Sequence, residues 1–297
     1  MNVLKLKSPA KLNLYLRILN KRPDGYNNIV TLFERINLFD DIVITQRPEG
    51  IKIICDNPQV PTGSANLAYK AARFLLEYAG IKKGCQIEIV KRIPPKSGLG
   101  GGSSNAAAAL LGLNRLWRLK LSKEELAKIA VKVGADVSFF LLNKSFAIGT
   151  GIGDKLEVLK RPSRPIWHVL ITPKEGLSTR LIYESWDKIN CKGSCKFGLT
   201  LALRDVKILH HSIQKNNINL LGKSLHNDLE RSAESESRIL LKIKGLLSAA
   251  QPVKGVLMSG SGATIFGIVH LRKEAREVAS QAANLNSSWQ IFVVKTY

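Results

Sequence analysis

Residues 94–105 read Pro94-Pro-Lys-Ser-Gly-Leu-Gly-Gly-Gly-Ser-Ser-Asn105, with four glycines in five positions. Upstream, residues 85–91 alternate apolar and polar side chains, which predicts a strand, and the alanine-rich residues 106–116 predict a helix. Glycines in such a turn carry no Cβ atoms that would keep backbone N–H groups away from an anion. The polar side chains of residues 103–105 are expected to cap the helix. The stretch therefore predicts a phosphate-binding turn.

Two other nucleotide-binding motifs are not completed by this sequence. Gly222-Lys-Ser224 has the ending of a Walker A loop, but Asn217 stands where that motif needs its first glycine. The glycines of residues 98–103 end in a serine, so they do not form a dinucleotide fingerprint. The phosphate site predicted here is of a different type.

The chain has 297 residues, 45% of them hydrophobic, and helix-like and strand-like segments alternate along it. This composition predicts an α+β protein with a sizeable core. No apolar run approaches the length of about 18 residues needed to span a membrane, and the first residues lack the apolar centre of a signal peptide. Four scattered cysteines do not suggest a disulfide framework. We expect a cytoplasmic protein without a membrane partner.

Lys and Arg exceed Asp and Glu by 45 − 23 = 22 residues. Such an excess is typical of proteins that bind nucleic acid through phosphate contacts. The basic residues are spread along the chain, however, and are not interleaved with aromatic residues as in RNA-binding motifs. A solvated basic surface, together with a site for anionic small molecules, is the favoured interpretation.

The first half of the chain alternates strand and helix signals. A capping-box sequence at residues 122–125 predicts a helix that continues to about residue 133. Strands are expected at residues 3–7, 11–17, 29–36, 41–46, 51–55 and 85–91, and residues 145–153 are expected to form a strand that leads into a glycine turn. Further helices are expected at residues 66–78 and from residue 106.

Three polar residues in this half have alternative interpretations. Lys11 and Asn13 share one face of a strand, which is either a solvated face or the wall of a polar cleft. Asp136 follows a helix end and is either a cap or a carboxylate close to a cation, as general-base catalysis on a hydroxyl requires.

The second half predicts a separate domain. Residues 161–165 contain two prolines and look like a linker, so we expect an N-terminal domain over residues 1–160 and a C-terminal domain over residues 161–297. The main elements expected here are strands at 167–172, 253–258, 263–269 and 290–295, and helices at 179–186, 203–214, 234–249 and 272–284. Their order is that of a ferredoxin-like unit.

Three motifs in this order resemble those of the GHMP small-molecule kinases. They are Ser8-Pro-Ala-Lys-Leu-Asn-Leu14, the glycine-rich stretch of residues 94–107, and Met258-Ser-Gly-Ser-Gly-Ala263. The resemblance implies an N-terminal domain like ribosomal protein S5, a C-terminal ferredoxin-like domain and an active site that uses both. It also implies ATP and Mg²⁺ as cofactors.

Five further segments are similar to a particular branch of that family. They are residues 22–26 (Arg-Pro-Asp-Gly-Tyr), 31–33, Asn105, 134–137 and 226–230. Members of this branch phosphorylate the 2-hydroxyl of 4-diphosphocytidyl-2-C-methyl-D-erythritol in the non-mevalonate isoprenoid precursor pathway. The resemblance thus implies a cytidine diphosphate sugar alcohol as substrate, and its 2-phosphate and ADP as products.

The resemblance also implies a role for individual residues. Asp136 would be the catalytic base and would contact the substrate, with Lys11 as its cationic neighbour. Asn66 and Lys96 would approach the adenine of ATP. The phosphates would lie against Pro94, Gly98, Gly100, Gly101, Gly102, Ser103 and Ser104, and Ser103 or Ser104 could bind Mg²⁺. The acceptor substrate would contact Asn13, Tyr26, Asn27, Phe33, Thr179 and Tyr183, with Tyr26 and Tyr183 on the two faces of the cytosine ring.

Asn27 departs from the pattern of this branch. The branch normally has histidine after Asp-Gly-Tyr, and that histidine hydrogen-bonds the cytosine edge. Asparagine also offers a donor and an acceptor, but on a shorter side chain. Asn27 is the feature that supports an alternative, a GHMP kinase acting on homoserine, mevalonate or a sugar.

A second alternative is a nucleic-acid-binding protein on an S5-like scaffold, motivated by the charge excess alone. The kinase interpretation predicts no specific nucleic-acid partner and a monomer or weak homodimer.

Overall fold

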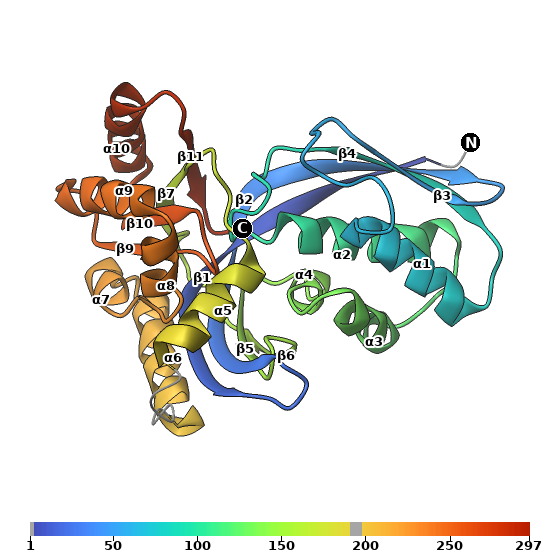
Figure 1. Ribbon diagram of the computed structural model, residues 1–297, viewed down its shortest axis with the longest axis horizontal. Coiled ribbons are helices and arrows are strands. Elements are labelled where there is room, and N and C mark those ends of the chain that lie inside the picture. The colour runs from blue at the N-terminus through green and yellow to red at the C-terminus, as the bar shows by residue number, and fades with distance from the viewer. Residues whose placement is uncertain (1–2, 191–197) are drawn as a thin grey trace. The chain divides into compact units, whose positions relative to one another are not determined.

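The computed structural model describes residues 3–190 and 198–297. The expected α+β class is confirmed, since helices and strands alternate along the chain (Figure 1). The fold forms two compact units. The first contains the described residues up to Ala10 together with Leu38–Pro95 and Gly100–Lys144, and the second contains Lys11–Asn37, Lys96–Leu99 and Ser145–Tyr297.

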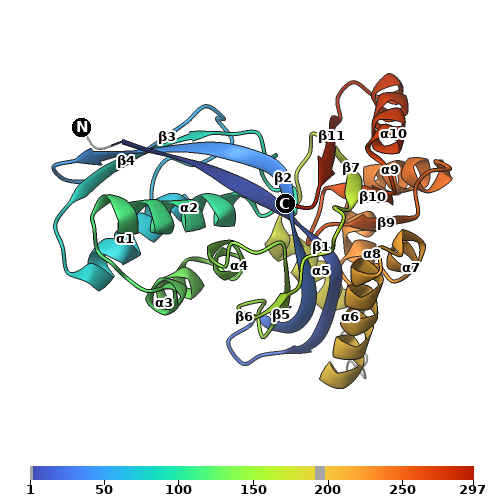
Figure 2. The same cartoon turned by 180° about the vertical axis from the view of Figure 1, so that it is seen from behind.

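The first unit is a sheet with helices on one face. It includes strand β1 (Val3–Lys21) up to Ala10 and strand β2 (Asn27–Arg47) from Leu38 onward. The sheet order is β3-β4-β2-β1. Strand β3 (Ile51–Cys55) is parallel to β4 (Gly84–Val90), and helix α1 (Leu67–Ala79) forms the crossover between them. Helices α1, α2 (Gly101–Leu116), α3 (Lys123–Val133) and α4 (Val137–Leu141) lie together on the same side of the sheet (Figure 2).

Local sequence signals explain where these helices begin. The side chain of Asn66 accepts hydrogen bonds from the backbone N–H groups of Ala68 and Tyr69, so it caps α1. Ser122 and Glu125 form the expected capping box at the start of α3. Helix α2 packs closely on the sheet, because a Cβ atom at Gly112 would lie 2.5 Å from the Ile44 side chain.

The second unit contains a four-stranded antiparallel sheet with the order β11-β7-β10-β9. Its strands are β7 (Trp167–Thr172), β9 (Gly255–Met258), β10 (Ile265–Val269) and β11 (Gln290–Lys295). Helices α9 (Arg238–Ala249) and α10 (Arg272–Leu285) bury apolar side chains in the same core as β7 and β10. This strand order confirms the ferredoxin-like expectation.

The second unit also contains the remaining part of β1, from Lys11, and of β2, up to Asn37, with the elements that pack around them. Strands β5 (Phe146–Thr150) and β6 (Lys155–Leu159) extend the sheet from β2, and the short β8 (His226–Asn227) runs parallel to β1. The remaining helices are α5 (Thr179–Asn190), α6 (Leu199–Gln214), α7 (Ile218–Lys223) and α8 (Glu230–Glu236).

Several elements differ from the sequence expectations. Strand β1 is continuous through Pro9, although a break was expected there; Ser8 and Ala10 are fully buried, and their packing outweighs the missing N–H of proline. The helix expected over residues 234–249 is interrupted at Ser237, which has an extended backbone and separates α8 from α9. Strand β2 is likewise continuous, although two strands were expected at residues 29–36 and 41–46. Strands β6 and β8 and helices α4 and α7 were not predicted.

Residues 161–165 form a connection without helix or strand, and the domain boundary at residues 160 and 161 stays a prediction. Cys191 and Cys195 lie outside the described residues. No helix in the described part of the chain combines the length and apolar character needed to cross a membrane.

Candidate active site

Lys11 is a buried cation held by two acceptors of the second unit. Its ammonium group donates to the side-chain oxygen of Asn13 and, at 2.9 Å, to the backbone carbonyl of Gly98. Lys11 and Asn13 are each only 3% exposed. Residues i and i+2 of a strand point to the same face, which is why β1 places them together. Of the two interpretations of this strand face, the structure therefore excludes the solvated one.

Asn13 is fixed by its neighbours on both sides. Its side-chain nitrogen donates to the Thr31 hydroxyl at 2.7 Å, and that hydroxyl donates to the backbone carbonyl of Tyr15 at 2.7 Å. Because a lysine only donates hydrogen bonds, the Asn13 oxygen must face Lys11, and this sets the orientation of the amide. The pair therefore presents a rigid polar surface.

Two glycine turns of the second unit meet beside Lys11. The Gly98 carbonyl accepts hydrogen bonds from both Lys11 and the Ser259 hydroxyl, the latter at 3.0 Å. A Cβ atom on Gly98 would lie 2.0 Å from the Ser259 carbonyl oxygen. A Cβ atom on Gly260 would lie 3.1 Å from the Asn13 side-chain oxygen and 3.2 Å from the Lys11 ammonium. Glycine is thus required for this close approach.

Asn227 holds the second glycine turn by two hydrogen bonds, and this role was not predicted. Its side-chain nitrogen donates to the backbone carbonyls of Met258 and Gly260, both at 2.8 Å. Residues 226–230 resemble a family segment, but the resemblance implies no individual role for them. Only the folded chain brings Asn227 to the turn at residues 258–262.

Helix α2 begins differently from the expectation. Its N-cap is Gly100, which has φ +70° and no side chain, and Ser103, Ser104 and Asn105 lie inside the helix. The expected side-chain caps were therefore wrong. Since no side chain at the N-cap accepts the first-turn N–H groups, these groups and the helix dipole are available to an anion.

The residues expected to lie near the adenine and the phosphates differ from one another in exposure and in hydrogen bonding. Asn66 uses its side chain to cap α1 and to reach the Pro61 carbonyl at 2.7 Å. Lys96 is exposed and has φ +52°, and Pro94 is buried. Their contacts with ATP stay predictions.

Asp136 precedes α4 in the first unit and is half-buried, while Lys11 belongs to the second unit. Their pairing in catalysis stays a prediction.

Apart from Asp136, the residues expected to contact the acceptor are in the second unit. Phe33 is buried, with its ring centroid 5.8 Å from the Lys11 ammonium, whereas Tyr26 is 61% exposed. The Thr179 hydroxyl is 2.8 Å from that of Ser261, and Tyr183 is half-buried on α5. Stacking of Tyr26 and Tyr183 on one ring stays a prediction.

Asn27 carries an unsatisfied acceptor. The residue is 7% exposed, and its side-chain oxygen is buried without a hydrogen-bond partner among the described residues. An unpaired buried oxygen of this kind costs about 1–3 kcal/mol. A donor supplied by a ligand would remove that cost.

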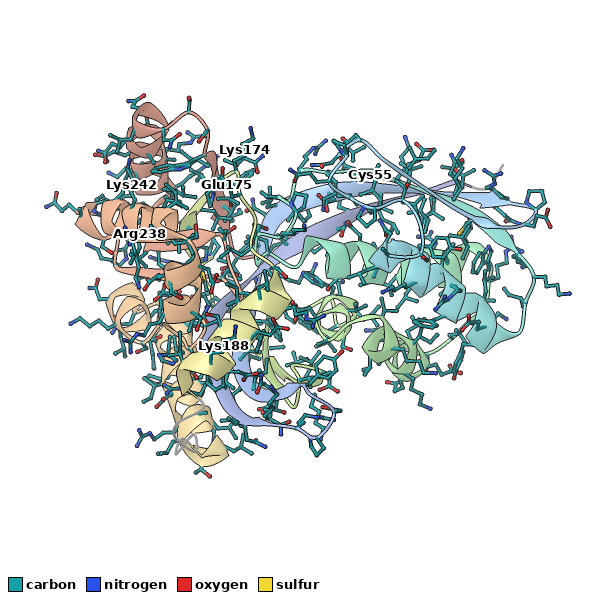
Figure 3. The ribbon with its side chains drawn as sticks, viewed as in Figure 1. Cys55, Lys174, Glu175, Lys188, Arg238 and Lys242 are labelled. Atoms are coloured by element: carbon teal, nitrogen blue, oxygen red, sulfur yellow. The ribbon has the colours of Figure 1, made fainter. Side chains whose placement is uncertain are left out.

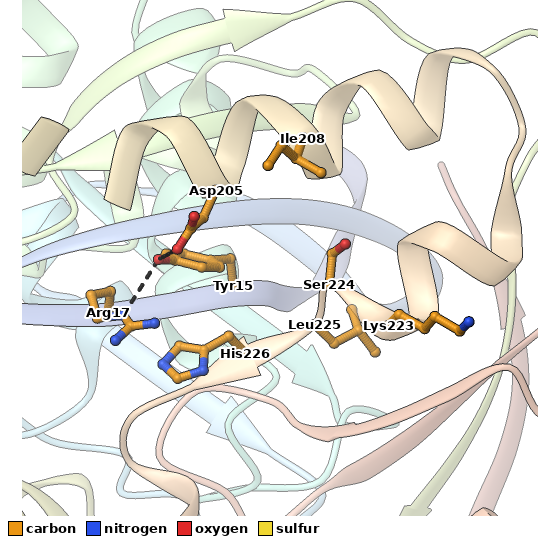
Figure 4. Close-up of a pocket in the computed structure, with 8 residues that line it drawn as sticks. All are labelled: Tyr15, Arg17, Asp205, Ile208, Lys223, Ser224, Leu225 and His226. Atoms are coloured by element: carbon orange, nitrogen blue, oxygen red, sulfur yellow. Dashed lines mark hydrogen bonds between the residues drawn. The ribbon is translucent and has the colours of Figure 1, made fainter. Parts of the chain in front are cut away.

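A separate cavity of about 260 Å³ lies farther along β1 (Figure 4). Tyr15 and Arg17 line it from β1, opposite Asp205 and Ile208 of α6, and residues 223–226 complete the wall. The Tyr15 hydroxyl donates to Asp205 at 3.2 Å, and burial raises the pKa of Tyr15 to about 12. The family resemblance gives none of its lining residues an individual role.

Comparison with known proteins identifies the class to which this fold and site belong. Residues 66–144 match the GHMP kinases N terminal domain, and residues 209–287 match the GHMP kinases C terminal domain. The chain belongs to the GHMP kinase family.

Individual relatives narrow the comparison. The chain is 39% identical to the 4-diphosphocytidyl-2-C-methyl-D-erythritol kinase of Syntrophus aciditrophicus (strain SB) over 99% of both chains. It is 37% identical to the protein of the same name from Acetivibrio thermocellus over 100% of both chains. A crystal structure of 4-(cytidine 5'-diphospho)-2C-methyl-D-erythritol kinase is similar, with a TM-score of 0.79 and 32% identity, and the match covers 99% of this chain and 100% of that chain.

The fold itself is shared more widely. The homoserine kinase from Cytophaga hutchinsonii has a TM-score of 0.77 at 20% identity, with 100% of this chain and 95% of that chain covered. At this identity the similarity shows the fold alone.

Proposed function

We propose that this kinase transfers the γ-phosphoryl group of ATP to the 2-hydroxyl of 4-diphosphocytidyl-2-C-methyl-D-erythritol. The products would be the 2-phosphate and ADP, in the non-mevalonate pathway to isoprenoid precursors. The observation that carries the acceptor is the similarity to relatives of that name along the whole chain, at 37–39% identity.

The first turn of α2 is the proposed site for the ATP phosphates. The N–H groups that follow Gly100 are not capped by a side chain, and the turn carries the hydroxyls of Ser103 and Ser104. Among the described residues there is no cluster of three His, Cys, Asp or Glu that could hold a metal. We propose that Mg²⁺ is held mainly by ATP oxygens, with Ser103 or Ser104 as its protein ligand, where it would neutralise charge on the phosphates.

Lys11 and Asp136 are the proposed catalytic residues. Asp136 would accept the proton of the 2-hydroxyl while the hydroxyl oxygen bonds to the γ-phosphorus and the bond to ADP breaks. The Lys11 ammonium, fixed by Gly98 and Asn13, would stabilise the negative charge that develops on the transferred group. Because the lysine is already held in place, little reorganisation would be needed during the reaction.

Asn27 is the proposed reader of the cytosine edge. Its buried, unpaired oxygen is suited to accept a hydrogen bond from the cytosine amino group. Tyr26, which lies next to it on the turn before β2 and is exposed, would offer one face for the ring. Thr179, Tyr183, Phe33 and Asn13 are proposed to complete the acceptor site.

The test is coupled ADP release from Mg-ATP by the purified protein. Diphosphocytidyl methylerythritol, mevalonate, homoserine and no acceptor are compared under one set of conditions. Turnover with the cytidylyl substrate alone supports the proposal. Turnover with another alcohol, or none while ATP still binds, refutes the proposed acceptor and retains the kinase.

Variants at residue 27 test the cytosine contact separately. Asn27→Leu removes the acceptor and should raise KM for the cytidylyl substrate about tenfold with KM for ATP unchanged. Asn27→His should keep or improve affinity. A large rise of KM in Asn27→His would mean that the pocket is shaped for a different group.

Nucleic-acid binding is the weaker candidate. Figure 3 labels four basic residues of the second unit, and all four are exposed: Lys174 after β7, Lys188 on α5, and Arg238 and Lys242 on α9. They come from three places in the fold, as expected for a dispersed basic surface. Weak duplex or RNA binding that disappears at moderate salt would agree with this, and tight, salt-resistant binding would contradict it.

A further inference from the structure

A buried polar cluster lies against the first turns of α2 in the first unit. It consists of Ser8 on β1, Asp40 on β2, Lys91 after β4, and Ser104 and Asn105 on α2. Ser8 and Asp40 are fully buried, and the Lys91 side chain is 4% exposed. Neither Asp40 nor Lys91 belongs to a motif that is recognisable in the sequence.

Asp40 is the anchor of this cluster. One carboxylate oxygen accepts the backbone N–H groups of Arg92 and Ile93 at 2.8 and 2.9 Å. The other accepts from the Lys91 ammonium and, at 2.8 Å, from the Asn105 side-chain nitrogen. The Asp40 carboxylate thus connects two segments by hydrogen bonds: residues 91–93, which precede the glycine-rich turn, and helix α2, which follows that turn. A buried charge of this kind is stable only when it is fully paired, as Asp40 is.

Asp40 also fixes the direction of a chain of hydrogen bonds. The Asn105 nitrogen must face the carboxylate, because its oxygen would be repelled there. Its second hydrogen goes to the Ser8 hydroxyl at 3.0 Å. Since Ser8 accepts from Asn105, its own hydrogen goes to the Ser104 hydroxyl at 2.7 Å.

Ser104 is the last residue in this chain of hydrogen bonds. It is 1% exposed, and its hydroxyl accepts from Ser8, so its own hydrogen points away from Ser8. No acceptor for that hydrogen is found among the described residues. A buried hydroxyl hydrogen without an acceptor is uncommon in proteins, and a ligand oxygen would supply the missing acceptor.

We propose that Asp40, Asn105 and Ser8 are positioning residues that orient the Ser104 hydroxyl to donate to a phosphate oxygen of ATP. The inference rests on the proposed ATP site at the first turn of α2. Asp40 and Asn105 act through Ser8 and do not touch the nucleotide.

Ser8→Ala is the central test. It removes the hydroxyl that links Asn105 to Ser104 by hydrogen bonds, and it leaves the ion pair of Asp40 and Lys91 intact. Affinity for ATP is measured by calorimetric titration of the full-length protein, which requires no acceptor substrate. The expected result is a dissociation constant about five- to tenfold higher, with KM for the acceptor unchanged. Ser8→Thr, which keeps a hydroxyl, should restore most of the affinity.

A second variant changes Asp40, at the other end of this series of hydrogen bonds. Asp40→Asn combined with Lys91→Met removes both buried charges together, so that neither is left unpaired. It should weaken ATP binding in the same direction as Ser8→Ala.

Asp56→Ala is the matched control for loss of local stability. Asp56 accepts the backbone N–H of Lys91 at 2.9 Å, so its loss loosens the same segment, but Asp56 has no hydrogen bond to Ser8, Ser104 or Asn105. It should lower the unfolding midpoint and leave ATP affinity unchanged.

Two outcomes would overturn the inference: unaltered ATP affinity in Ser8→Ala, or weakened affinity in Ser8→Ala and Asp56→Ala in proportion to their loss of stability. If the unaltered protein binds no ATP, both this inference and the proposed function fail. Normal ATP binding without turnover refutes only the proposed acceptor.

Discussion

Gly98→Ala tests the contact between the two glycine turns. Gly98 has φ +76°, and an alanine there costs about 1–2 kcal/mol from backbone strain alone. The new methyl group would lie 2.0 Å from the Ser259 carbonyl oxygen, which is well inside contact distance, so the turns must separate. The Gly98 carbonyl would then lose its hydrogen bonds from Lys11 and Ser259.

The expected loss of stability follows from these contacts. A hydrogen bond from a charged group contributes about 1.5–3 kcal/mol and a neutral one about 1 kcal/mol. With the backbone strain, Gly98→Ala should destabilise the protein by about 4 kcal/mol. For a chain of this size, that lowers the unfolding midpoint by roughly 10 °C. Since Lys11 is displaced as well, kcat should fall.

Gly245→Ala is the matched control, because it makes the same chemical change in α9. Nothing lies within 4 Å of a Cβ atom at Gly245, and alanine favours a helix over glycine by about 0.5–1 kcal/mol. The control should therefore raise the midpoint slightly and leave kcat unchanged. Thermal unfolding followed by circular dichroism, together with steady-state kinetics, measures both effects. A Gly98→Ala variant with the stability and kcat of the unaltered protein would refute the reasoning.

Three further predictions concern single side chains. Asp136→Asn should lower kcat by about 10²–10⁴ and leave ATP binding intact, and full turnover would show that another group is the base. Burial raises the pKa of Tyr15 to about 12 from 10.0, so the unfolded chain loses this proton first and stability should fall as the pH rises from 10 to 12. Urea unfolding should show a shallower fall in Tyr15→Phe, and an equal fall would contradict the assignment. Burial also raises the pKa of the Cys85 thiol to about 12. In a variant with Cys55→Ser, Cys191→Ser and Cys195→Ser, Cys85 is the remaining thiol, and a thiol reagent should modify it only after unfolding; modification of the native variant would contradict the burial of Cys85.

The sequence by itself determined the elements that depend on local patterns. The sequence predicted a helix from Asn66 and a capping box at Ser122, which agree with the starts of α1 and α3, and alternation predicted the strands of the ferredoxin-like sheet. The three motifs and their order were sufficient to predict the family, since the residues within each motif are close in sequence. Alternation also placed Lys11 and Asn13 on one face of a strand.

Tertiary structure decided whatever depends on contacts between distant segments. Proline at position 9 suggested a break, yet the burial of its neighbours keeps β1 continuous, and the extended backbone of Ser237 divides a helix that looked uninterrupted. The hydroxyls expected to cap α2 lie within it, because the cap is Gly100 and Ser104 bonds to Ser8, 96 positions away. No local signal marks Asp40 as the partner of Lys91 and Asn105, because a buried charge network is defined only when three separate segments have packed together.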